Sequence, residues 1–161
     1  MDIKDLFDKL SSYNLFNYLL PGAAFSVIAE SLSGFKLVQE DLLNAFFVYY
    51  LIGMLISRIG SILIEPVLKK IKFVKFSDYG KYINKSKEDP LLTTLSEQNN
   101  TYRTLLSMFI LLLIVDNIEA LQGKFPWLDH NMPSLLLTGM IILLAFSYRK
   151  QTNYITKRVE R

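Results

Sequence analysis

The chain has 161 residues, of which 51% are hydrophobic and 20% charged, and its mean hydropathy is +0.26. This length suits one compact unit, and the charged residues crowd into a few segments, which indicates a membrane protein more than a soluble domain. The net charge is only +3, so we expect no direct contact with nucleic acid. The chain has no cysteine, which excludes a disulfide framework, a thiolate metal site and a lipidated cysteine.

Residues 1–12 predict an amphipathic helix. Ile3, Leu6, Phe7 and Leu10 follow helical spacing, and charged residues fill the opposite face. Such a helix can lie in the membrane interface, and packing on the protein's own cytoplasmic part is the alternative.

Residues 13–32 predict the first transmembrane span, with a break at Pro21 and Gly22. Helices in lipid tolerate such a break where a neighbouring helix satisfies the freed carbonyl groups. A cleavable signal peptide is the rival interpretation. It is disfavoured because acidic residues precede the apolar run, where a signal peptide carries positive charge.

Residues 42–64 predict the second span, and the rest of the chain is organised around it. The run is apolar on every side, which indicates lipid or a deep core. Small residues recur along it at a spacing that lets another helix backbone approach closely. They are Gly53, Ser57, Gly60 and Ser61. This stripe predicts helix packing, either within the chain or between subunits of an oligomer.

Residues 65–103 predict a cytoplasmic helical stem that joins the second and third spans. Its start carries a cluster of cations, for which we expect contact with anionic lipid headgroups. They are Lys69, Lys70, Lys72 and Lys75. Asp78 marks a helix start, and Asp89 followed by Pro90 marks another, which we expect to continue into the third span.

Residues 104–121 predict the third span, residues 132–148 the fourth, and residues 149–161 a short basic tail. Lysine and arginine concentrate in the stem and the tail, whereas the two remaining loops carry only Lys36 and Lys124. The positive-inside rule therefore places both termini in the cytoplasm. The predicted fold is an all-α, four-helix transmembrane bundle in the inner membrane of a bacterium.

Four ionisable residues fall in or beside the apolar segments: Arg58, Glu65, Asp116 and Glu119. Arg58 and Glu65 share a helical face and can form a network with a neighbouring helix through Asn99 or Asn100. In the alternative, the arginine side chain extends to the lipid headgroups and the glutamate is solvated. Asp116 and Glu119 can line the mouth of a cation path through an oligomer. An early helix end with a hydrated Asp116 is the alternative.

No enzyme signature is present. The sequence has no phosphate-binding glycine loop, no dinucleotide fingerprint and no zinc-protease motif, so we expect no catalytic residue, cofactor or metal. A polar stretch just before the third span instead suits a docking surface for a soluble partner, with a capped, solvated helix turn as the alternative. Its residues are Glu97, Asn99, Asn100, Tyr102 and Arg103.

Three short motifs together resemble small four-span inner-membrane proteins of bacteria. They are Leu19-Leu20-Pro21-Gly22, Ser57-Arg58-Ile59-Gly60 with Glu65-Pro66, and Asn99-Asn100 with Tyr102-Arg103. Some proteins of this kind are membrane components of anti-phage defence systems. The resemblance implies action by oligomerisation, membrane perturbation or partner anchoring, and it assigns no catalytic residue.

The leading hypothesis is a non-enzymatic, homo-oligomeric membrane effector or sensor that forms a pore or perturbs the bilayer when triggered from the cytoplasm. A membrane anchor or scaffold that recruits a soluble cytoplasmic partner is the alternative. A small-molecule carrier is disfavoured because no internal repeat pairs two broken helices.

Overall fold

The computed structural model describes residues 11–160, apart from the side chains of residues 129 and 130, and within this range the chain forms helices and no strand. In chain order the elements are α2 (Ser12–Asn14), η1 (Leu15–Leu19), α3 (Leu20–Ser33), α4 (Leu42–Ile59), η2 (Gly60–Ile64), α5 (Glu65–Lys70), α6 (Tyr79–Glu88), α7 (Leu91–Asp116), α8 (Ile118–Lys124) and α9 (Trp127–Val159). The predicted all-α class is confirmed. The helix predicted over residues 1–12 lies almost wholly outside the described residues.

Polar side chains cap the starts of several helices, among them the starts predicted at Asp78 and Asp89, and a glycine ends α3. Asp41 Oδ1 accepts from the backbone N–H of Asn44 at 2.8 Å and caps α4. Asp78 caps α6 in the same way, and Asp89 Oδ1 accepts from the N–H of Leu91 at 3.0 Å. Gly34 ends α3 with φ of 70°, a left-handed conformation in which a side chain is unfavourable.

Two π-helical turns, η1 and η2, each precede a proline by two residues. Pro21 follows η1 and Pro66 follows η2. Proline lacks an N–H, and its ring collides with the carbonyl group four residues earlier. A wide π turn just before each proline, in which the hydrogen bond spans five residues, relieves that collision and lets the helix continue.

Within the part of the chain that the structure describes, three helical segments are long and apolar enough to cross a membrane: Ser12–Ser33, Leu42–Lys70 and Asn131–Val159. A fourth results if α7 and α8 are taken as one span, although the two helices meet at a bend of 49°. The segment predicted as the third span, residues 104–121, is therefore divided between two helices. It breaks at Asn117, where the side-chain amide donates to the carbonyl oxygen of Leu113 at 2.9 Å.

Two helices extend further than their predicted spans. α7 begins at Leu91, so the end of the stem and the third span are one helix, as predicted. α9 begins at Trp127 and continues to Val159, so it includes the end of the predicted loop and most of the predicted basic tail.

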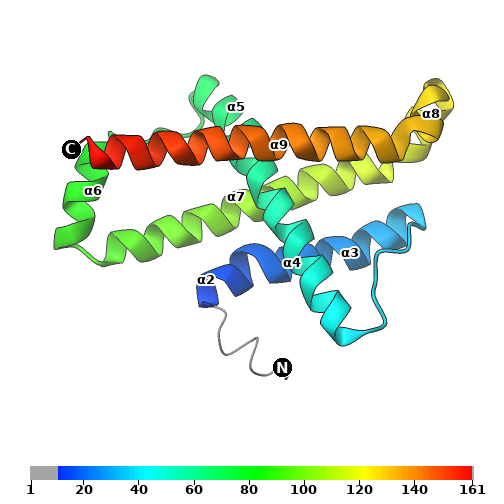
Figure 1. The fold of residues 1–161 in the computed structure, drawn as a ribbon, viewed down its shortest axis with the longest axis horizontal. Helices are drawn as coiled ribbons and strands as arrows, with labels where there is room; N and C mark the ends of the chain where they lie inside the picture. The colour runs from blue at the N-terminus through cyan, green and yellow to red at the C-terminus, as the bar shows by residue number, and fades with distance from the viewer. Residues whose placement is uncertain (1–10, 161) are drawn as a thin grey trace.

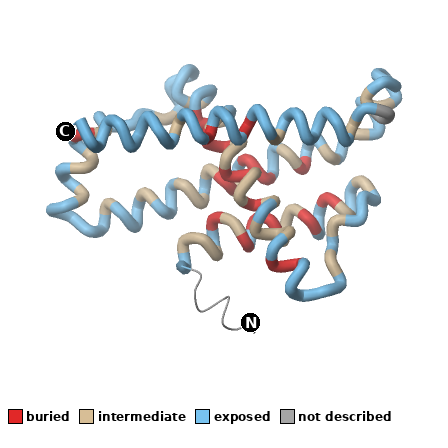
Figure 2. The backbone as a smooth tube through the Cα atoms, viewed as in Figure 1, coloured by how far each residue is buried: buried red, intermediate tan, exposed pale blue. Residues whose placement is uncertain are grey.

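The helix α4 crosses α3 and α7 steeply, and α9 lies along the outside of this crossing (Figure 1). The turn after α3 and helix α8 lie at one end of the molecule, and α6 and the end of α9 lie at the other. Figure 2 shows that buried residues gather where α4 passes its neighbours. The apolar part of this core is formed by Ala29, Ile56, Met108 and Leu112.

Large apolar side chains cover much of the outer surface. In α9, Leu137 is 62% exposed and Ile141 is 69% exposed, and most other apolar side chains of this helix are exposed as well, whereas Leu143 is buried. A water-soluble protein rarely leaves so continuous an apolar surface in contact with solvent. This surface is what a helix bundle presents to lipid.

Candidate functional site

A buried polar network joins three helical segments at the centre of the molecule. Asn17 from η1 and Thr104 from α7 are both fully buried, and Ser57 from α4 is 5% exposed. Thr104 Oγ1 lies 2.8 Å from Asn17 Oδ1 and 3.0 Å from Ser57 Oγ. We call these three residues the core network.

The core network has a partner for each of its polar groups. The amide of Asn17 donates to the hydroxyl of Tyr13 at 3.2 Å and to Ser57 Oγ at 3.3 Å. Thr104 Oγ1 also lies 2.9 Å from the carbonyl oxygen of Asn100. In an apolar core, a satisfied network of this kind holds helices in one register, because any shift leaves a polar group unpaired.

A second cluster surrounds the carboxylate of Glu65, at the start of α5. Glu65 is 6% exposed and faces three cations from three helices. Arg103 of α7 donates to Oε2 at 2.6 Å, Lys69 donates to Oε1 at 2.7 Å, and Lys150 of α9 lies 3.6 Å from Oε1. We call these four residues the Glu65 cluster.

Lys150 also connects α9 to η2. Its ammonium group donates to both the carbonyl oxygen and the hydroxyl of Ser61, each at 2.7 Å. Glu65 and Lys150 thereby join the start of α5 to the middle of α7 and to the C-terminal half of α9. A single carboxylate shared by three cations leaves the cluster with surplus positive charge, and the buried Nε of Arg103 has no hydrogen-bond partner among the described residues.

The predicted small-residue stripe packs within the chain, and each member contacts a different neighbour. Gly53 lies against the backbone of Tyr18, and Gly60 lies against the side chains of Ser107 and Arg103. Ser57 belongs to the core network and Ser61 binds Lys150. All four residues therefore contact other helices of the same chain.

The predicted network between Arg58 and Glu65 is not formed. Glu65 pairs with Arg103, while Arg58 is half-buried and makes no ion pair with it. Asn99 is exposed, and Asn100 contributes through its carbonyl group to Thr104, not to Glu65. The pairing differs because α7 presents Arg103 to the face of α5 that carries Glu65.

The predicted docking residues divide into two groups. Glu97, Asn99 and Tyr102 are exposed on α7, and Tyr102 is 70% exposed. Arg103 is held inside the Glu65 cluster and is not available to a partner. Of the four predicted headgroup lysines, Lys69 binds Glu65 and its ammonium group lies 4.0 Å above the ring of Phe76, whereas Lys70, Lys72 and Lys75 are exposed.

Asp116 is the last residue of α7, and Glu119 lies in the first turn of α8. Both are exposed and are separated by the bend at Asn117. The placement of Asp116 at a helix end agrees with the alternative in which the helix emerges early.

The arrangement is suited to holding helices together. Within residues 11–160, no group of three or more histidine, cysteine, aspartate or glutamate side chains could hold a metal ion. The two polar clusters consist of hydrogen bonds and ion pairs between helices, which set the register and the closure of the bundle.

Sequence reasoning did not find Asn17, Thr104 or Lys150. Asn17 carried a usable signal, because a lone amide in an apolar span four residues before a proline usually needs a partner on another helix. No such signal marks Thr104 or Lys150, because threonine and lysine are common at the ends of membrane spans. No protein-family model, curated protein or solved structure that was compared with the chain matches it.

Proposed function

We propose that the chain is a non-enzymatic effector or sensor of the bacterial inner membrane, which acts as an oligomer in anti-phage defence. In this proposal both termini face the cytoplasm, and movement of α9 perturbs the bilayer. The proposal is supported by the three or four helices of membrane-spanning length and by the large apolar outer surface.

The observation that carries the proposal is that α9 contacts the rest of the protein along one narrow face. Among the described side chains of α9, those that are not exposed follow one face of the helix, and they include Met140, Leu143, Ser147 and Lys150 at successive helical turns. The strongest polar contact on that face is between Lys150 and Ser61, next to Glu65. A long apolar helix held by one polar junction can detach when the junction is disturbed, and can then pair with a second copy or deform the lipid around it.

Replacing Lys150 with methionine should weaken this junction and raise membrane permeability. We expect faster entry of a membrane-impermeant dye, and a lower membrane potential, in bacterial cells that express Lys150→Met than in cells with the same amount of the wild-type protein. Lys157→Met is the matched control, because Lys157 lies on the exposed last turn of α9. Equal dye entry with all three proteins would overturn the effector proposal.

A scaffold is the second candidate function, and the exposed aromatic ring of Tyr102 favours it. Tyr102 lies with Glu97 and Asn99 on the part of α7 that precedes the predicted third span. Tyrosine is enriched where proteins bind each other. A scaffold should leave the membrane potential intact in every strain of the dye experiment, and should retain a soluble partner that Tyr102→Ala releases.

A further inference from the structure

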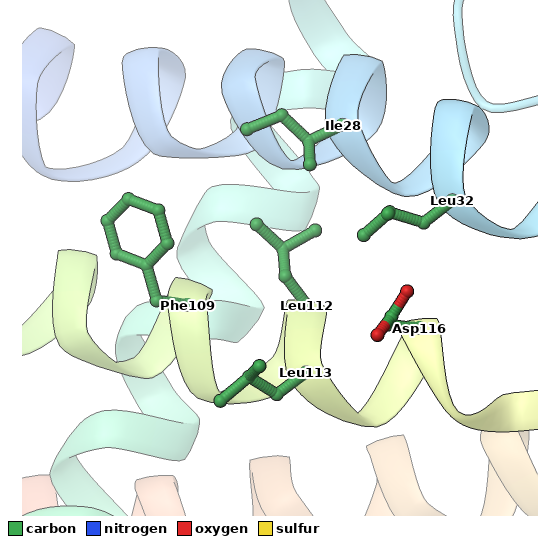
Figure 3. A pocket seen from close by; sticks show the side chains of 6 residues that line it. All are labelled: Ile28, Leu32, Phe109, Leu112, Leu113 and Asp116. Atoms are coloured by element: carbon green, nitrogen blue, oxygen red, sulfur yellow. The ribbon is translucent and has the colours of Figure 1, made fainter.

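An apolar groove with one acidic end lies between α3 and α7. It has a volume of about 380 Å³ and is lined by Ile28 and Leu32 of α3 and by Phe109, Leu112, Leu113 and Asp116 of α7. Figure 3 shows the apolar side chains along its length and the Asp116 carboxylate at one end, beside Leu32. The volume falls within the range of about 300–1,000 Å³ that is usual for sites that bind small molecules.

The carboxylate of Asp116 is the unpaired charge of this groove. Within residues 11–160 it makes no hydrogen bond and no ion pair. Glu30, near the same end of α3, differs, because its carboxylate accepts from the backbone N–H groups of Leu37 at 2.7 Å and Val38 at 2.6 Å. Asp116 is exposed, so a cation that approaches from outside the groove can reach this carboxylate.

The shape of the groove matches an amphiphile with a cationic head. Asp116 and Phe109 are seven residues apart on one helix, so the groove continues for about 10 Å from the carboxylate towards the middle of α7. Asp116 lies where the helix ends, and the apolar side chains lie towards the interior of the span. A lipid in a bilayer has the same order, with its headgroup at the boundary and its acyl chain inwards.

We propose that this groove binds a phospholipid with a primary ammonium headgroup, such as phosphatidylethanolamine. The ammonium group donates to Asp116, and one acyl chain lies on Phe109, Leu112 and Leu113. A phosphatidylcholine headgroup has no N–H to donate, and the carboxylate repels an anionic lipid, so the site discriminates between headgroups. The inference depends on the proposed placement in a membrane, but not on pore formation or on a role in defence.

Lipid retention by the purified protein tests the headgroup. The protein is equilibrated with equal amounts of phosphatidylethanolamine, phosphatidylcholine and phosphatidylglycerol with identical acyl chains, and the retained lipids are measured by native mass spectrometry. We expect about three- to fivefold preference for phosphatidylethanolamine, the ratio that one partly exposed charged contact gives. Asp116→Asn should remove the preference, and Glu119→Gln should keep it, because Glu119 does not line the groove.

A tryptophan in the groove tests the acyl chain. Phe109→Trp is introduced together with Trp127→Phe, which removes the one native tryptophan. Lipid brominated in its acyl chains should quench this tryptophan more strongly as phosphatidylethanolamine than as phosphatidylcholine, and Asp116→Asn should abolish the difference.

Equal retention of the three lipids, or a preference that survives Asp116→Asn, would overturn the lipid site. Either result leaves the effector proposal intact, because that proposal is tested by dye entry. Conversely, if the protein retains phosphatidylethanolamine selectively but never permeabilises cells, the effector proposal fails and the lipid proposal stands.

Discussion

Replacing Gly53 with alanine should destabilise the protein by about 3 kcal/mol or more, because the new methyl group has no space at the crossing of η1 and α4. A Cβ at Gly53 would overlap the carbonyl oxygen of Tyr18, and a Cβ at Gly22 would overlap that of Tyr49 and lie 2.8 Å from the backbone nitrogen of Gly53. The obstacles are backbone atoms, so side-chain rotation cannot relieve the collision. The two helices must separate, and the core network between Asn17 and Ser57 then loses its geometry.

Thermal unfolding in detergent, followed by size-exclusion chromatography of the heated samples, measures this effect. Gly139→Ala is the matched control, because a Cβ at this position of α9 meets no atom within 4 Å. It should be neutral or slightly stabilising, since alanine favours helix more than glycine does. Equal midpoints for Gly53→Ala and Gly139→Ala would contradict the close crossing of η1 and α4.

Glu65→Gln should cost about 3 kcal/mol of stability, because it leaves two half-buried cations without their counter-charge. Glutamine has the size of glutamate but no charge to offset Arg103, whose side chain is 17% exposed, or Lys150, whose side chain is 28% exposed. The same unfolding measurement in detergent records the loss. The segment of α7 around Arg103 and the C-terminal half of α9 should also become more accessible to protease, because the cluster is what ties them to α5.

Glu88→Gln controls for the loss of one negative charge. Glu88 pairs with Lys85 at 2.7 Å, but the Glu88 side chain is 66% exposed, and exposed pairs contribute about 1 kcal/mol at most.

A double-mutant cycle that combines Glu65→Gln with Arg103→Met separates the energy of the ion pair from general damage to the fold. If Glu65 and Arg103 act as a pair, the double variant should be more stable than the sum of the two single losses predicts. Additive losses would show that the ion pair contributes nothing of its own.

The sequence was sufficient to predict the helices and the central role of the second span, and physical reasons explain why. Apolar runs of span length, with Asp41, Asp78 and Asp89 as caps, specify helices locally, without knowledge of the fold. The spacing of Gly53, Ser57, Gly60 and Ser61 similarly specifies a face where other helices approach closely. What these residues meet on that face depends on how α3, α7 and α9 are arranged in space.

For the same reason, the sequence alone could not predict which polar side chains pair with each other. Glu65 and Arg58 share a helical face, but Glu65 pairs with Arg103, which is 38 residues away in the sequence. The position of the bend at Asn117 was not predicted, because residues 104–121 contain no proline or glycine, although Asp116, Asn117 and Glu119 interrupt the apolar run there. Asn17 and Thr104, 87 residues apart, become partners only when η1 and α7 are packed on α4.

The membrane placement of the helices is the claim on which the effector, lipid and orientation proposals all depend. Because the chain has no cysteine, single substitutions give clean probes of it. Gln39→Cys lies in the turn after α3, and Ser86→Cys lies in α6, at opposite ends of the molecule (Figure 1).

A membrane-impermeant maleimide applied to intact cells with a permeabilised outer membrane provides the most direct test. We expect Gln39→Cys to be labelled at once and Ser86→Cys to be labelled only after the inner membrane is lysed. Labelling of both residues, or of neither, before lysis would contradict it, as would labelling of Ser86→Cys alone.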